Sequence, residues 1–429
     1  MTVLITIVLL FFFLAFGMPI ALALGVAGAI GLLMLGGPGL LFGVAQTTPY
    51  ESVANFLLTT IPMFILMAEF MTASGITKTM FHAAHKWLGH LPGGLGIATV
   101  FAGAGLAAVS GSSTASAATL SASAVPEMKR YGYQTSFALG TVSIAGTLAI
   151  MIPPSIVLIL YGILTETGVG DLLIAGIIPG ILTALGYIVT IYIWAKVKPE
   201  VAPRIPVRPS MKERLQSLKG IWPMMVLVIA VIGSIYAGLV TPTEAGAVGA
   251  FLAFLIALSM RTLNTQKVFQ ALSGTVRSTA MILTIVIGAM IFGYFLTITQ
   301  FTQNLILYVQ SLEISRWVIF AFVVILYLIL GFFLDQIAIL ILTLPITFPL
   351  VTSLGFDPIW FGIIVTKTAE IGLVTPPVGM NVFVAAGAAG VRTAEAFKGV
   401  FWFVITDLMI LLILILFPGL STWLPSMMF

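Results

Sequence analysis

Two stretches decide the fold: LAIMIPPSIVLILYG (residues 148–162) and IGLVTPPVGMNVFVAAG (residues 371–387). Each places a Pro-Pro pair in the middle of a long apolar segment. Proline lacks an N–H group and clashes with the preceding turn, so two in succession should interrupt a helix. An interrupted helix leaves free carbonyls on one half and free N–H groups on the other. The sequence therefore predicts two broken membrane spans, at 134–162 and 359–387.

The composition around these stretches is that of a polytopic membrane protein. The chain has 429 residues, of which 60% are hydrophobic and 7% charged, against roughly 25% charged in an average soluble domain. The net charge of +4 is too small and too scattered for a nucleic-acid footprint. Because the chain has no cysteine, disulfides, thiolate chemistry and Cys-bound metals are excluded.

The apolar segments predict an all-α membrane fold. A span needs about 20 apolar residues, and two further segments, 94–125 and 317–348, are too long for one span and too short for two. Both carry polar residues at their middle, namely Ser110-Gly111-Ser112-Ser113 and Asp335-Gln336, which indicates re-entrant hairpins. The ten expected spans are 2–17, 19–35, 53–76, 134–162, 172–196, 221–239, 243–260, 279–299, 359–387 and 400–424.

The basic residues orient this arrangement. If the basic linker 198–220 is cytoplasmic, the predicted topology places sixteen of the 18 Lys and Arg residues on that side, as the positive-inside rule requires. Both termini then lie on the opposite, periplasmic side. Counting either hairpin as one crossing would destroy this agreement.

The prolines also indicate an internal duplication. A shift of 223 residues places Pro19 on Pro242, Pro126 on Pro349, and Pro153-Pro154 on Pro376-Pro377. Five crossings per half is an odd number, so the halves 1–197 and 221–429 should be inverted relative to each other. The same shift superposes the two hairpin tips, which predicts two related sites near the midplane.

These motifs, with SGSSTASAAT (residues 110–119) and MPIALALG (residues 18–25), closely resemble the large membrane subunit of the tripartite ATP-independent periplasmic (TRAP) transporters, the DctM-like M subunit. The resemblance covers essentially the whole chain and is strongest to the sialic acid members. It implies a sodium-driven elevator-type transporter of the ion-transporter superfamily, located in the bacterial inner membrane. It also implies two partners, a separate small four-helix Q subunit and a periplasmic binding protein that delivers an organic acid, either sialic acid or a C4-dicarboxylate.

The resemblance places sodium sites at the hairpin tips and the facing helix breaks. Sodium prefers carbonyl and hydroxyl oxygens, which these segments supply, and no other cofactor is expected. The substrate is placed between the two sites, near Ser113, Ser155 and Asn381. Sodium site 1 is expected at Ser110, Ser112, Ser113, Gly146, Pro153 and Pro154, and sodium site 2 at Asp335, Thr375, Pro376, Gly379 and Met380.

The remaining ionisable residues have competing interpretations. Lys367 and Glu370 lie three residues apart in one span, which favours a mutually neutralising structural pair. Arg316 could meet a substrate carboxylate or a lipid headgroup. The histidine cluster FHAAHKWLGHLPGG (residues 81–94) is typical of an interfacial helix, with residues 301–313 as its counterpart. Glu69, Glu244 and Asp407 could satisfy neighbouring polar groups, contact the small subunit or bind a ligand.

Other functional classes fit the sequence less well. An intramembrane hydrolase would need a base beside the serines, and the three histidines lie outside the predicted membrane core. A passive channel conflicts with two hairpins that end inside the membrane, and an ATP-driven pump would need a P-loop, which the sequence lacks. The alternative that stays open is an ion-coupled carboxylate transporter of the same superfamily that works without a binding protein.

Overall fold

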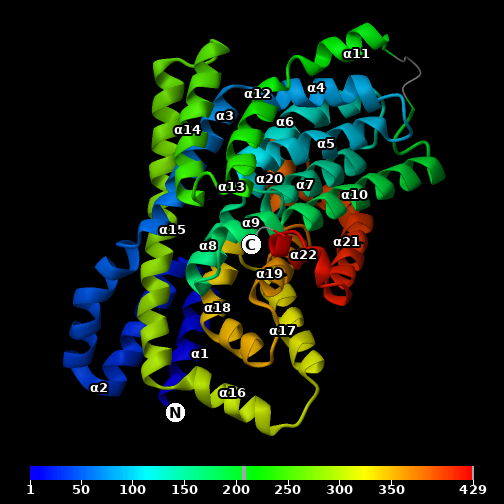
Figure 1. Ribbon diagram of the computed structural model, residues 1–429. Helices are drawn as coiled ribbons and strands as arrows, with labels where there is room; N and C mark the ends of the chain where they lie inside the picture. Colours follow the sequence, from blue (N-terminus) through cyan, green and yellow to red (C-terminus); the bar gives the residue numbers. More distant parts are fainter. Residues whose placement is uncertain (205–208, 428–429) are drawn as a thin grey trace.

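The computed structural model describes residues 1–204 and 209–427, and every regular element within these ranges is a helix (Figure 1). This confirms the predicted all-α class. Part of the predicted linker 198–220, residues 205–208, lies outside the described residues. The rest of the linker includes a short helix, α11 (Met211–Leu218), which begins with a capping box of Ser210 and Glu213.

The first half of the chain forms ten α-helices before the linker, with a short 3₁₀ helix (Phe56–Thr59) between the second and the third. The second α-helix is kinked at Gly36 and Gly37, where the backbone leaves the helical conformation. The ten are α1 (Thr2–Ala15), α2 (Ile20–Val53), α3 (Thr60–Ala73), α4 (Ile76–Leu88), α5 (Gly94–Ser110), α6 (Ser113–Arg130), α7 (Thr135–Met151), α8 (Ile156–Thr165), α9 (Val169–Ala175) and α10 (Ile177–Val197).

The second half follows the linker. A π-turn at Ile229–Gly233 joins its first two helices. Its helices are α12 (Trp222–Val228), α13 (Ser234–Tyr236), α14 (Pro242–Ser259), α15 (Thr265–Ile298), α16 (Phe301–Ser311), α17 (Arg316–Gly331), α18 (Gln336–Ser353), α19 (Pro358–Gly372), α20 (Met380–Ala389), α21 (Thr393–Leu416) and α22 (Gly419–Thr422).

Helices that correspond under the 223-residue shift occur in the same order in both halves. The pair α5 and α6 (hairpin 1) corresponds to α17 and α18 (hairpin 2), and the pair α7 and α8 to α19 and α20. Corresponding elements lie at opposite ends of the long helix α15: α4 and hairpin 1 at the top, α16 and hairpin 2 at the bottom (Figure 1). This is the placement expected of halves that are inverted relative to each other.

The number of continuous spans differs from the ten predicted. Within the described ranges, eight helices, or up to nine if a bent pair counts, are long and apolar enough to cross a membrane. The predicted span 2–17 is a helix of 14 residues, and the predicted span 359–387 is divided into helices of 15 and 10 residues. The division of 359–387 confirms the predicted break, and the span 2–17 is shorter than expected because apolar length does not record where the backbone ends a helix.

The far arms of both hairpins extend beyond the predicted ends at 125 and 348. Helix α6 continues through Pro126 to Arg130, and α18 continues through Pro345 and Pro349 to Ser353. Packed membrane helices tolerate proline because neighbouring groups can satisfy the freed carbonyl. In these two hairpin arms a single proline therefore does not interrupt the helix, whereas each Pro-Pro pair does.

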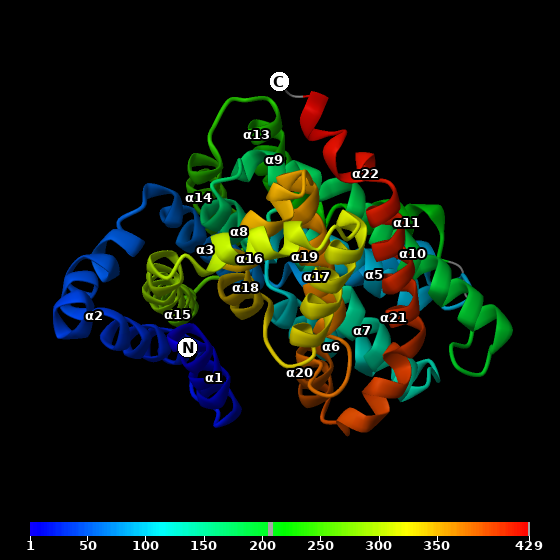
Figure 2. The same ribbon diagram turned by 90° about the horizontal axis from the view of Figure 1, so that it is seen from below.

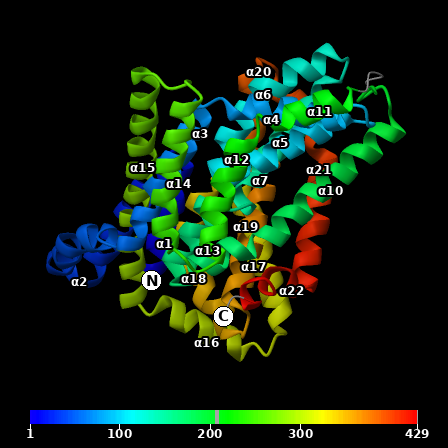
Figure 3. The same ribbon diagram turned by 45° about the horizontal axis from the view of Figure 1, so that its top comes forward.

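The helices form two groups. The outer group comprises α1, α2, α3, α14 and α15, and the inner group comprises both hairpins, both broken helices, α10 and α21. Figures 1 and 3 show α14 and α15 along one flank, with α5, α7, α10 and α21 gathered on the other, and Figure 2 shows this division from below.

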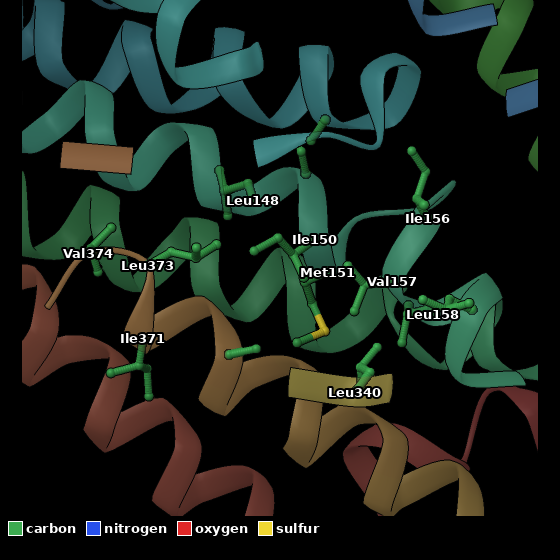
Figure 4. Close-up of a cluster of buried hydrophobic side chains, with 14 of the residues drawn as sticks. Leu148, Ile150, Met151, Ile156, Val157, Leu158, Leu340, Ile371, Leu373 and Val374 are labelled. Carbon is green, nitrogen blue, oxygen red and sulfur yellow. The ribbon is translucent and has the colours of Figure 1, made fainter. Parts of the chain in front are cut away.

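The two broken helices occupy the centre of the inner group. Helix α7 is buried from Phe137 to Met151, and α19 is buried from Trp360 to Gly372. Break 1 (residues 152–155) and break 2 (residues 373–379) are flanked by apolar side chains that pack into one cluster with Leu340 of α18 (Figure 4). The two interrupted stretches therefore lie together.

The crossing of α7 and α21 should be sensitive to side-chain size. A Cβ atom at Gly399 of α21 would collide with the backbone carbonyl of Ser136, and one at Gly387 of α20 would meet nothing within 4 Å. We expect Gly399→Ala to lower the free energy of unfolding by about 1–3 kcal/mol through overpacking. Gly387→Ala, the control, should be neutral or stabilising. Thermal unfolding in detergent measures both, and equal melting temperatures would contradict this packing.

Candidate functional site

The tip of hairpin 1 is a tight turn between two helices. Helix α5 ends at Ser110, Gly111 has a φ of 58°, and the hydroxyl of Ser112 caps α6 by accepting a hydrogen bond from the N–H of Ala115. Glycine suits this left-handed position. The hydroxyl of Ser113 is buried and has no hydrogen-bond partner within the described chain. The tip therefore presents an oxygen that is free to bind a ligand.

Break 1 lies directly against this tip. A Cβ atom at Gly111 would lie 2.9 Å from the carbonyl oxygen of Pro154, so only glycine permits this approach. Ser155 begins α8: its hydroxyl accepts a hydrogen bond from the N–H of Leu158 and donates one to the carbonyl of Ile150. These two bonds engage the hydroxyl of Ser155, which the resemblance places near the substrate.

The tip of hairpin 2 uses a carboxylate in the corresponding position. Asp335 begins α18, and its Oδ1 accepts hydrogen bonds from the N–H groups of Ile337 at 2.9 Å and Ala338 at 3.1 Å. Gly331, at the end of α17, packs against Gly372 at the end of α19. Hairpin 2 therefore packs against the end of α19, directly before break 2.

Break 2 is longer and more open than break 1. Thr375 donates its hydroxyl to the carbonyl of Ile371 at 2.6 Å, and Pro376 is exposed. Gly379 has a φ of 54° and packs against Phe397. The N–H of Asn381 donates to the carbonyl of Leu373 at 3.0 Å, which joins the two ends of the break.

Both hairpin tips open into one cavity of about 680 Å³. The cavity lies between the inner group and the helices α3 and α15 of the outer group. Its polar lining comes from both tips and from the outer group: Ser110, Ser112, Ser113, Thr114, Asp335, Gln336, Glu69, Thr72 and Ser278.

The predicted site residues fall into two sets. Those that line the cavity are Ser110, Ser112, Ser113, Asp335 and Met380. The others surround it without forming its wall: Gly146, Pro153, Pro154, Ser155, Thr375, Pro376, Gly379 and Asn381.

Two of the residues outside the wall serve the packing of the inner group. Gly146 lies in α7 against Ala117 of α6, where a Cβ atom would lie 2.8 Å from the Ala117 nitrogen. Asn381 is buried, with its Nδ2 3.5 Å from the carbonyl of Ser143 and its Oδ1 without a partner in the described chain.

Sequence reasoning did not assign the outer wall of the cavity. Glu69 and Thr72 on α3 and Ser278 on α15 face the tips. A carboxylate inside an apolar span is the signal that marked Glu69 in the sequence, which left its role open. Nothing in the sequence shows which face of α15 turns toward the hairpins.

The cavity has an acidic lining. Glu69 and Asp335 supply two carboxylates, and the lining includes no Lys, Arg or His. Such a site attracts cations and repels an unaccompanied anion. Within the described residues, no three Asp, Glu, His or Cys side chains come together as a metal centre. Any ion in the cavity would therefore depend on hydroxyl and carbonyl oxygens as well as on a carboxylate.

The histidine cluster lies away from this cavity. Helix α4 carries His82 and His85, and the ring of His85 packs edge-on against Tyr131 at 5.7 Å. Burial lowers the pKa of His85, which the charge of Glu127 partly opposes. The indole of Trp87 donates to the carbonyl of Arg214 at 3.1 Å and joins α4 to α11. Through this contact, α4 supports the linker helix α11.

Comparisons with known proteins agree on one family. The model of the DctM component of tripartite ATP-independent periplasmic transporters matches residues 7–420. The C4-dicarboxylate TRAP transporter large permease protein DctM of Pseudomonas aeruginosa is 39% identical over 408 residues, 94% of each chain. The sialic acid TRAP transporter large permease protein SiaM of Vibrio cholerae is 30% identical over 412 residues, 96% of this chain and 95% of the relative.

Two further comparisons concern chain organisation and fold. The isethionate TRAP transporter permease protein DctMQ of Oleidesulfovibrio alaskensis is 34% identical over 95% of this chain, which spans 64% of that relative. Among solved structures, the YdaH transporter of Alcanivorax borkumensis superposes with a TM-score of 0.59 over 88% of each chain, at 14% identity. The second likeness shows the fold alone.

The shared cavity can be tested by labelling, because the chain has no native cysteine. Single cysteines at Ser112 and Gln336 should react with a charged, membrane-impermeant thiol reagent added from the same side of the membrane. A cysteine at Ser143, which is fully buried in α7, should not react. Labelling of the two tips from opposite sides in one preparation would contradict a single cavity.

Proposed function

Because the chain belongs to the DctM component family of tripartite ATP-independent periplasmic transporters, we propose that it is the membrane permease of a sodium-coupled importer of an organic acid. The family is one of carboxylate transporters that depend on a binding protein. The observation that carries the sodium coupling is the shared cavity, with two carboxylates and no basic residue in its lining. A carboxylate substrate is repelled there unless cations enter with it.

The two tip and break pairs are the proposed sodium sites. At site 1, the hydroxyls of Ser110, Ser112 and Ser113 lie beside a break whose Pro154 carbonyl approaches Gly111. These neutral oxygens suit a hard monovalent cation. At site 2, Asp335 adds a carboxylate, and the carbonyls of break 2, from Thr375 to Gly379, would complete the shell. Backbone carbonyls freed by helix breaks hold coupling ions in this way in transporters with inverted repeats.

We propose an elevator movement of the inner group along the outer group. The outer group is suited to remain fixed, because the glycines of α2 let α15 approach closely. Gly28 packs against the backbone of Phe292, and Gly31 packs against the ring of Phe295. The cavity lies at the boundary between the groups. Sodium would favour the position in which it binds more tightly, and this differential affinity is what couples the gradient to transport.

The substrate and the partners follow from the family. The sequence motifs favour sialic acid. The relative that is 39% identical is named as a C4-dicarboxylate transporter, and the sialic acid relative SiaM is 30% identical. Both acids are therefore candidates. The proposed partners are a periplasmic binding protein and a small Q-type subunit; the DctMQ relative extends well beyond the region that matches this chain. We place the complex in the bacterial inner membrane with both termini of this chain periplasmic.

Uptake into proteoliposomes tests the proposal. With the small subunit and the binding protein added, we expect labelled sialic acid or succinate to accumulate only under an inward sodium gradient. Replacing sodium with potassium on both sides is the control. Accumulation that does not depend on sodium would overturn the coupling. Full uptake without the binding protein would favour the alternative, an ion-coupled carboxylate transporter that needs no such partner.

Site 2 offers a matched pair of variants. Asp335 and Asp357 both begin helices, α18 and α19, by accepting backbone N–H bonds, but only Asp335 lines the cavity. Asparagine retains an oxygen for capping and removes the charge. We expect Asp335→Asn to raise the sodium concentration for half-maximal uptake roughly tenfold or more, the equivalent of about 1.4 kcal/mol. Asp357→Asn should resemble the wild type; equal sodium dependence in both variants would remove Asp335 from the site.

A further inference from the structure

A cluster of charged side chains lies inside the inner group, apart from the cavity. The ammonium of Lys367 on α19 lies 3.1 Å from Oε2 of Glu370 on the same helix and 2.6 Å from Oδ1 of Asp407 on α21. All three residues are fully buried. The predicted pair of Lys367 and Glu370 is therefore part of a three-membered cluster that includes Asp407.

The cluster joins both halves of the chain. The hydroxyl of Thr147 on α7 lies 2.8 Å from Oε1 of Glu370, and these residues are separated by 223 positions, the repeat spacing. A residue can contact its own counterpart only near the axis that relates the two halves. Tyr187 on α10 closes the cluster, with its hydroxyl 2.8 Å from Oδ1 of Asp407 and 3.2 Å from Oε1 of Glu370.

The formal charges in this cluster do not balance. One ammonium and two carboxylates give a net charge of −1 if all three groups are ionised. An uncompensated charge in a fully buried, membrane-embedded site is very unfavourable, and such groups change protonation state instead. No Arg or further Lys of the described chain pairs with either carboxylate. The cluster therefore needs one more positive charge, and a proton is the smallest that can supply it.

The donors of Lys367 are fully used. Its three N–H groups point to Thr183 at 3.2 Å, to Glu370 and to Asp407. Thr183 in turn donates its hydroxyl to the carbonyl of Pro179 at 2.9 Å. No donor on this side of the cluster is left for Oε1 of Glu370.

The hydroxyls on the other side have acceptors other than Glu370. Tyr187 has a single proton and lies closer to both oxygens of Asp407, at 2.8 and 2.9 Å, than to Glu370. Thr147 also has a single proton, and the carbonyl of Ile144 lies 2.8 Å from its hydroxyl. If these two protons go to Asp407 and Ile144, the oxygens of Thr147 and Glu370, 2.8 Å apart, have no proton between them.

We propose that Glu370 holds a bound proton on Oε1 and donates it to the hydroxyl oxygen of Thr147. The contact between Glu370 and Thr147 then has one donor and one acceptor, and the cluster becomes a neutral acid beside a Lys367–Asp407 ion pair. The charged or titratable groups that face Glu370 are Lys367 on its own helix, Tyr187 on α10 and Asp407 on α21. From α7 only the Thr147 hydroxyl faces it. The proton acts as a positioning element that holds α7 to α19 and keeps the two breaks in register.

Two isosteric variants of the full-length chain distinguish the carboxylates. In Glu370→Gln, the amide can donate to Thr147 as the proposed acid does, and no charge is lost. In Asp407→Asn, the ammonium of Lys367 loses its only ionised partner. We expect the melting temperature in detergent to change by less than about 2 °C for Glu370→Gln and to fall by about 6 °C or more for Asp407→Asn.

Infrared spectroscopy provides a readout that stability alone does not. The wild-type chain should show the C=O stretch of a protonated carboxylic acid at neutral pH, and Glu370→Gln should remove it. The assignment of this band to Glu370 rests on the comparison of the wild type with Glu370→Gln. It does not require that Asp407→Asn folds. The proposal is overturned if no such band depends on Glu370, or if Glu370→Gln is as destabilised as Asp407→Asn. Both readouts are independent of transport, so they stand or fall separately from sodium coupling.

Discussion

The constraint on which the structure depends is the need to satisfy interrupted backbone inside a membrane. In hydrocarbon, every free N–H and carbonyl group must find a partner within the protein. Both broken helices are therefore enclosed by the hairpins, with Gly111 against Pro154 in one half and Gly331 against Gly372 in the other. The hairpins supply this enclosure only because glycine allows such close approach. The same enclosure brings the oxygen atoms of both hairpin tips to one cavity.

The two halves solve the same capping problem with different chemistry. Ser112 and Ser155 begin α6 and α8 with neutral hydroxyls, while Asp335 begins α18 with a carboxylate. At break 2 no side chain caps α20, whose N-cap residue is Gly379. The cavity is consequently asymmetric: its charge comes from hairpin 2 and from Glu69, and its neutral hydroxyls come from hairpin 1. A duplicated scaffold can in this way hold two sites of unequal charge.

Local signals located the breaks and the tips, while tertiary contacts could not be predicted. A Pro-Pro pair removes two backbone donors whatever surrounds it, so its effect can be read from the sequence. Pro126 and Pro349 show the limit of that reasoning, because each continues a helix that its neighbours support. The role of Asp407 was left open because nothing local indicates that α21 turns it toward Lys367, 40 residues earlier.

The buried cluster shows why an inverted duplication can retain charge in only one of its halves. The shift that relates Thr147 to Glu370 also relates Ile144 to Lys367, so the first half carries an apolar and a hydroxyl residue where the second carries a lysine and a glutamic acid. If the cluster lay away from the axis, each half would need its own set of charged residues. Because Thr147 and Glu370 contact each other, one set of charges serves both halves. A second set at the same place would double a buried charge that already requires compensation, so the asymmetry is what the geometry favours.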